Sequence, residues 1–130
     1  MNRSSVLSSL VLAGLTLFTF AVLRNSSPET TVRLFHFAVA KSDLAAARRV
    51  CVKDSDAELS SLYSDLQQLY RDNVSVSLGR IDRSESDRVV AQFNYRGPNY
   101  IHTKFWVVDR VGGKWLVNPG ATLAYPIDKF

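Results

Sequence analysis

The chain has 130 residues, 46% of them hydrophobic and 22% charged, which is the composition of one globular domain and not of a disordered protein. Arg3 and Arg24 flank an apolar stretch, and without them the chain has 14 basic and 12 acidic residues. This small net charge argues against a nucleic-acid-binding protein, which would carry a large excess of basic residues. The single cysteine, Cys51, excludes an internal disulfide, and we expect it to be a buried apolar residue.

Residues Val6 to Leu23 form an uncharged apolar stretch of 18 residues. As a helix rising about 1.5 Å per residue, the stretch would cover roughly 27 Å of a hydrocarbon core about 30 Å thick. A signal peptide normally has an apolar region of about 7–15 residues that ends in a small-x-small cleavage site. Here the best site, Thr19-Phe20-Ala21, is followed by more apolar residues. We therefore expect residues 1–24 to be an uncleaved, single-pass membrane anchor; cleavage after Ala21 and secretion is the alternative.

The charges around this stretch predict its orientation. The amino terminus and Arg3 precede it, whereas Arg24 alone follows closely. The positive-inside bias then keeps the amino terminus in the cytoplasm and exports the domain over residues 25–130, to the periplasm if the cell is bacterial. The membrane, bound through Val6 to Leu23, is thus the first expected partner.

Three helices are predicted next, each from a start signal and an apolar spacing. Ser26-Ser27-Pro28-Glu29 offers a cap, a proline at the first helical position and a capping box, and this helix should stop near Lys41-Ser42. Asp43 caps a short second helix that runs through Val50. A second capping box, Ser55-Asp56-Ala57-Glu58, opens a third helix that ends at about Asp72.

After Asn73 the apolar period changes to two, which predicts four strands. They cover Val74–Leu78, Val89–Tyr95, Tyr100–Asp109 and Lys114–Asn118, with a glycine turn at Val111-Gly112-Gly113. Helices that precede an antiparallel meander predict an α+β fold, in which the helices pack on one face of a curved sheet of about four strands.

At this point the chain resembles the NTF2-like superfamily, the cystatin-like α+β or cone fold. The segment Ser27–Phe35, running into Ala38–Asp43, is similar to the opening helix of the family and its junction aspartate, and Asp109–Val117 is similar to its last hairpin with an inward tryptophan. The resemblance covers about Ser26 to Pro119 and implies the cone fold, with a sheet one or two strands short of the larger members. It implies no single function, because the superfamily includes isomerases, dehydratases, transport factors and secretion scaffolds.

Enzymes of this superfamily place an Asp or Glu base at an inward strand position of the cone, with help from Tyr, His or a second acid. The physical reason is that an apolar cavity raises the pKa of a carboxyl group into the useful range. The predicted strands hold no acid before Asp109, and the acids lie at caps, on polar helix faces, in loops, at a turn and in the tail. Two histidines far apart in the sequence make no recognisable metal motif. We therefore predict no catalytic residue, no metal and no cofactor.

A ligand pocket inside the cone remains an open interpretation. Its candidate residues are aromatic or imidazole side chains at inward positions: His36, Tyr63, Tyr70, Phe93 and Phe105. Such residues are most often core, and a histidine in an apolar helix is more often a hydrogen-bonded core residue than a ligand.

The opposite strand face carries Tyr100, His102, Trp106 and Val108, and an exposed aromatic stripe of this kind indicates a protein contact. The tail Ala121 to Phe130 would cover that face or engage a partner. The sequence thus predicts a non-catalytic, membrane-anchored module that assembles or stabilises a membrane-associated complex, through a protein partner or a homodimer at the open sheet face. The alternative is a small-molecule-binding or isomerase- or dehydratase-like enzyme that uses the cone pocket.

Overall fold

The computed structural model describes residues 27–126, and the predicted anchor over residues 1–24 lies outside this range. Within residues 27–126, no helix combines the length and the apolar character that crossing a membrane requires. The helices and strands follow one another as α2 (Pro28–Ala40), α3 (Leu44–Arg49), α4 (Asp56–Arg71), β1 (Ser75–Asp82), β2 (Arg88–Arg96), β3 (Ile101–Val111), β4 (Lys114–Val117) and α5 (Pro119–Ala124). The predicted α+β class, with helices ahead of an antiparallel sheet, is confirmed.

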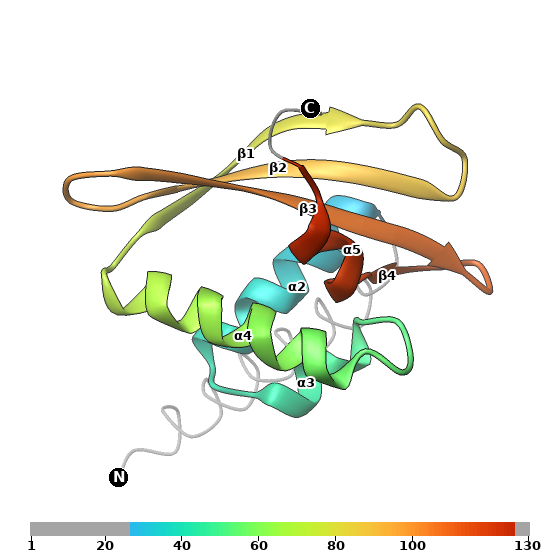
Figure 1. Ribbon diagram of the computed structural model, residues 1–130, viewed down its shortest axis with the longest axis horizontal. Helices are drawn as coiled ribbons and strands as arrows, with labels where there is room; N and C mark the ends of the chain where they lie inside the picture. Colours follow the sequence, from blue (N-terminus) through green and yellow to red (C-terminus); the bar gives the residue numbers. More distant parts are fainter. Residues whose placement is uncertain (1–26, 127–130) are drawn as a thin grey trace, which may run out of the picture.

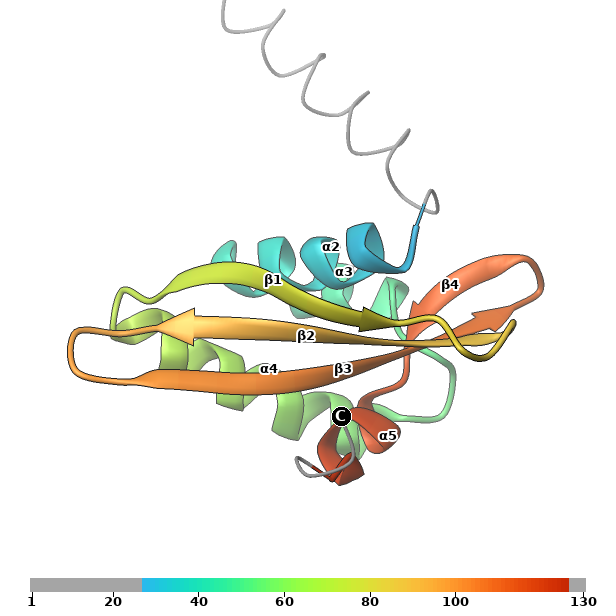
Figure 2. The same cartoon turned by 90° about the horizontal axis from the view of Figure 1, so that it is seen from above.

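The four strands form one antiparallel meander in the order β1-β2-β3-β4. Figure 1 shows two layers, with the sheet above and helices α2, α3 and α4 below it. In the view from above, β1, β2 and β3 run side by side across the molecule, whereas the short β4 diverges at one end (Figure 2). The turn before β4 uses Gly112 and Gly113 at φ values of 57° and 79°, as the predicted glycine turn requires.

The helices begin where the sequence predicts, but not all through the predicted contacts. Ser27 caps α2, and Glu29 pairs with Arg83 of the β1–β2 loop, while Ser26, the other member of the predicted capping box, lies outside the described residues. Asp43 caps α3 by accepting a backbone N–H three residues on, at 3.1 Å. Ser55 precedes α4 without a cap hydrogen bond and donates to a carbonyl three residues earlier, so the second predicted capping box is absent.

The main core lies between the lower face of the sheet, called here the inner face, and helices α2 and α4. It contains the largest fully buried side chains, which are Trp106, Tyr95, Phe35, Phe93, Leu59, Leu62 and Leu66. Cys51 is buried in the same core, as predicted, and burial raises the pKa of its thiol to about 12. The segment around Cys51 also forms a parallel bridge to Val117, which ties the end of α3 to β4.

The faces of β3 are the reverse of the prediction. Tyr95 of β2 pairs with His102 and Ala91 pairs with Trp106, so the even-numbered residues of β3 share the inner face with the core residues of β2. Trp106 and Val108 are both 0% exposed. The prediction that they form an exposed protein interface is therefore wrong, and only the outer part of that stripe, Tyr100 and His102, is exposed.

The opposite, outer face carries a second small cluster, called here the outer cluster: Val90, Phe105 and Val107, covered by Ala121 and Tyr125. The rings of Phe105 and Tyr125 lie 5.6 Å apart. Within the described residues the tail covers this outer face, through a helix that was not predicted, and not the face of Trp106 and Val108 on which it was predicted to lie. Placing Phe105 in the cone was wrong, because this side chain points to the outer face.

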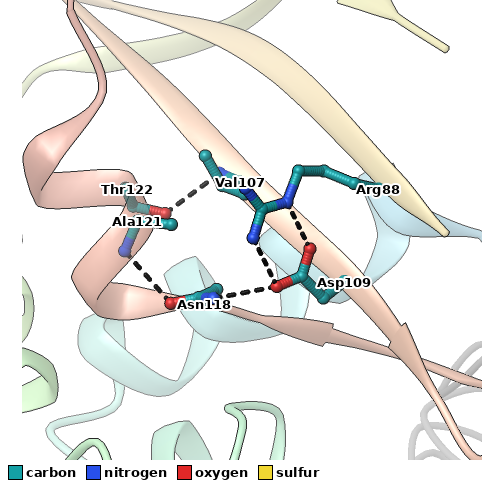
Figure 3. A network of polar contacts seen from close by, with 6 residues as sticks. All are labelled: Arg88, Val107, Asp109, Asn118, Ala121 and Thr122. Atoms are coloured by element: carbon teal, nitrogen blue, oxygen red, sulfur yellow. Dashed lines mark hydrogen bonds and ion pairs between the residues drawn. The ribbon is translucent and has the colours of Figure 1, made fainter. Parts of the chain in front are cut away.

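A polar network holds α5 against the free part of the β3 edge (Figure 3). Asp109 accepts two hydrogen bonds from Arg88, at 2.7 and 3.1 Å, and one from Asn118, at 2.8 Å. Asn118 also caps α5, and the hydroxyl of Thr122 accepts the N–H of Val107 at 3.0 Å. This part of the edge would otherwise present unpaired backbone groups, so α5 blunts it.

Candidate functional site

Three polar side chains form a continuous hydrogen-bond chain inside the core. Trp106 donates from Nε1 to the hydroxyl of Tyr95 at 2.9 Å. The hydroxyl lies 2.6 Å from His36 Nε2, and His36 Nδ1 lies 2.7 Å from the carbonyl of Val32. Because a carbonyl only accepts, His36 carries a proton on Nδ1. In the neutral imidazole Nε2 is then an acceptor, so the Tyr95 hydroxyl accepts from Trp106 and donates to Nε2. This chain is called here the aromatic relay.

The aromatic relay is a closed structural network. Burial lowers the pKa of His36 to about 4, so the imidazole is neutral at pH 7, and burial likewise raises the pKa of Tyr95. Within residues 27–126, every buried side-chain nitrogen or oxygen has a hydrogen-bond partner. Beneath the inner face, the fully buried rings of Phe35, Tyr95 and Trp106 fill the space between the sheet and α2, with the centres of the Phe35 and Trp106 rings 5.2 Å apart.

A shallow cavity of about 290 Å³ remains beside the relay, called here the α2 hollow. It is lined by Arg33, His36, Phe37, Ala40, Tyr70, Val76 and Phe93. The structure thus brings together three of the five predicted pocket residues, namely His36, Tyr70 and Phe93. Tyr63 does not line the hollow and is part of the main core. Partial burial raises the pKa of the Tyr70 hydroxyl.

A larger groove of about 580 Å³ runs between α4 and β3, and it was not among the predicted sites. It is lined by Asp65, Gln68, Leu69, Arg71, Asp72, His102 and Lys104. Lys104 stands on the same strand face as Trp106, and its side chain is only 13% exposed. A lysine inside an apolar strand, sharing a face with a core tryptophan, was the signal that could have located it.

Both acids of this groove have a partner. The ammonium group of Lys104 lies 3.9 Å from Asp65, and Tyr100 donates to Asp72 at 2.8 Å. Burial lowers the pKa of Lys104, and burial together with the charge of Lys104 lowers that of His102. The groove holds both signs of charge, so it does not select a cation or an anion by net charge.

In the part of the chain that the structure describes, no three His, Cys, Asp or Glu side chains come close enough together to hold a metal ion. Asp109 is an acid near the end of strand β3. Burial acts to raise the pKa of its carboxyl group, but hydrogen bonds from Arg88 and Asn118 outweigh this effect and lower the pKa overall. An acid in this state is a poor general base at neutral pH.

The outer sheet face beyond the outer cluster is largely polar. Gln92, Asn94 and Thr103 form a hydrogen-bonded row across β2 and β3, with Thr103 to Asn94 at 2.9 Å. Ile101, two residues from Thr103 on β3, is 61% exposed, the most exposed large apolar side chain that the structure describes.

Comparisons with known proteins give little beyond this architecture. No protein-family model matches the chain, and no curated protein matches it. Among solved structures, the chain is similar to an NTF-2-like protein of unknown function from Shewanella oneidensis MR-1, with 11% identity and a TM-score of 0.42 over 68% of this chain and 88% of that chain. Similarity at this level assigns neither a family nor a function, so the α+β description rests on the strand order and helix packing given above.

Proposed function

We propose that the chain is a membrane-anchored, non-catalytic NTF2-like module that assembles or stabilises a membrane-associated protein complex. Three helices followed by a four-stranded meander support the NTF2-like part of the proposal. The anchor at Val6 to Leu23, and the export of the domain, are inferred from the apolar stretch and its flanking charges.

The observation that carries the non-catalytic part is the filled interior of the cone. An enzyme needs a reactive group beside space for its substrate, with a pKa matched to proton transfer. Here the inner face holds the aromatic relay, in which His36 and Tyr95 are neutral and bonded to each other. The interior of the described domain therefore serves packing, and function is expected on its surface.

The contact surface of this proposal is the outer sheet face, centred on Ile101 in place of the buried Trp106. An exposed branched apolar side chain beside a row of amides and hydroxyls offers an apolar centre with a polar rim, as protein interfaces do. The partner is another protein or a second copy of the chain.

The test compares Ile101→Arg with Val111→Arg in the full chain, expressed in its own membrane and extracted in a mild detergent. Both side chains are exposed on β3, at 61% and 51%, so both variants should fold. During size-exclusion chromatography, we expect Val111→Arg to elute in the same large complex as the wild type. We expect Ile101→Arg to elute separately from that complex. Elution of Ile101→Arg with the wild-type particle would reject the region of the outer face around Ile101 as the contact.

A second candidate, a small-molecule-binding or isomerase-like protein, is favoured by the α2 hollow, where His36 and Tyr70 meet an apolar lining. It predicts that the purified full chain carries a small apolar compound, detectable by mass spectrometry after denaturation. Ala40→Trp should displace that compound, because Ala40 lines the hollow and indole would fill it. A wild-type chain that releases no compound would argue against this candidate.

A further inference from the structure

The solvent side of α2 and its C-cap carries an unusual stripe. Four exposed residues share one side of this helix: Arg33, Phe37, Ala40 and Lys41. The last three follow Arg33 by four, seven and eight positions, which is the spacing of one helix face. Phe37 is 45% exposed and lies between the two cations. The rest of this helix is mostly buried, so the stripe is what α2 presents to solvent.

The α2 hollow opens beside this stripe. Phe37 and Ala40 form one wall, and Tyr70, Val76 and Phe93 supply aromatic and aliphatic carbon from α4, β1 and β2. The hollow measures about 290 Å³ and is open to solvent beside an exposed aromatic ring, so it has room for one or two apolar side chains of a peptide.

The rim of the hollow is positive. The guanidinium of Arg33 lies 6.0 Å from the centre of the Phe93 ring, and the ammonium of Lys41 lies 5.2 Å from that of Phe37. Among residues 27–126, neither cation makes an ion pair with a carboxylate. Glu29, one turn before Arg33, pairs with Arg83. No acidic side chain lines the hollow. The positive charge at its rim therefore favours a negatively charged ligand.

We infer that the α2 hollow docks an acidic segment of a partner protein, which inserts an apolar side chain between Phe37 and Tyr70 and sets its carboxylates beside Arg33 and Lys41. The inference goes beyond the proposed function, because it adds a second contact surface on the helical side of the domain. The two surfaces are tested by different variants, so failure of one leaves the other standing.

The experiment selects binders from a displayed library of random short peptides against the full chain held in detergent micelles. We expect the selected peptides to contain an apolar anchor flanked by Asp or Glu. Their binding, followed by fluorescence anisotropy, should weaken about tenfold or more in Phe37→Ser and in the double variant Arg33→Glu, Lys41→Glu. Peptides with Lys in place of their acids should regain binding to the double variant.

The matched control is Arg110→Glu, because Arg110 also lies over an aromatic ring, 5.8 Å from the centre of Trp115, on the β3–β4 hairpin. This variant should bind the selected peptides as the wild type does. Three outcomes would overturn the inference: no peptides selected, peptides without an excess of acids, or binding that survives both α2 variants. If vesicles of anionic lipid bind through Arg33 and Lys41 while no peptide does, the stripe contacts a membrane and the inference is equally wrong.

Discussion

Both faces of the sheet are buried at positions 105 to 108 of β3, but by different means. On the inner face, α2 and α4 cover a continuous core that contains the hydrogen bonds of the aromatic relay. On the outer face, three buried residues are covered by the six-residue helix α5 and by Tyr125. The inner face therefore holds the domain together, whereas the outer cluster is a local cover kept in place by Asp109 and Asn118. Substitutions on the two faces should differ accordingly.

The largest difference is expected between Trp106→Ala and Phe105→Ala, neighbours on β3 that point to opposite faces. Trp106→Ala should lower the free energy of unfolding by about 3–5 kcal/mol, because it leaves a cavity in the main core and removes a donor to Tyr95. Phe105→Ala should cost less, since the cover formed by α5 can close over a smaller side chain. Urea denaturation measures both, and a larger loss in Phe105→Ala would break the comparison.

The inner face should also respond to acid through His36. Its pKa in the folded state is lowered to about 4, below the ordinary 6.5, so the unfolded chain binds this proton more readily. The contribution of neutral His36 to the free energy of unfolding is therefore complete above about pH 6.5 and is lost as the pH drops toward 4. The total loss is up to about 3 kcal/mol.

The measurement for this prediction is the free energy of unfolding against pH, in the wild type and in His36→Gln. The variant should lose part of the acid sensitivity, whereas His102→Gln, at an exposed site, should retain nearly all of it. Identical pH profiles for wild type and His36→Gln would show that the relay does not hold His36 neutral.

The smallest effect is expected at the edge network. Asn118→Ala removes the cap of α5 and one hydrogen bond to Asp109, which should cost about 1 kcal/mol. The loss should be local: the amide of Val107, bonded to Thr122, should exchange faster with solvent while the amides of β2 keep their protection. Hydrogen exchange that rises equally across β2 and β3 would mean that the outer cover is part of the main core.

Local signals predicted most of the elements. Ser27, Pro28 and Asp43 start helices through contacts within a few residues, so α2 and α3 could be located from the sequence. The overlooked α5 also carries such a signal, an Asn cap followed by proline at the first helical position. Its six residues, which include Gly120, show no helical spacing of apolar side chains. The segment was therefore predicted to be an irregular tail.

The face assignment of β3 could not be predicted, because positions 105 to 108 are all buried and apolar. A strand covered on both faces loses the alternation that tells inside from outside, and only its pairing with β2 decides. The same error placed Phe105 in the predicted pocket and Trp106 in the predicted interface. His36, Tyr70 and Phe93 line the α2 hollow together, because α2, α4 and β2 each keep a clear apolar pattern.

The central claim is that this domain acts through its surface and not through a substrate held inside the cone. Native mass spectrometry of the full chain, extracted from its own membrane in a mild detergent, tests the claim most directly. We predict a particle that contains the chain and a second protein, or a second copy, in fixed stoichiometry. A lone chain that carries a small molecule, lost in Ala40→Trp, would contradict the claim.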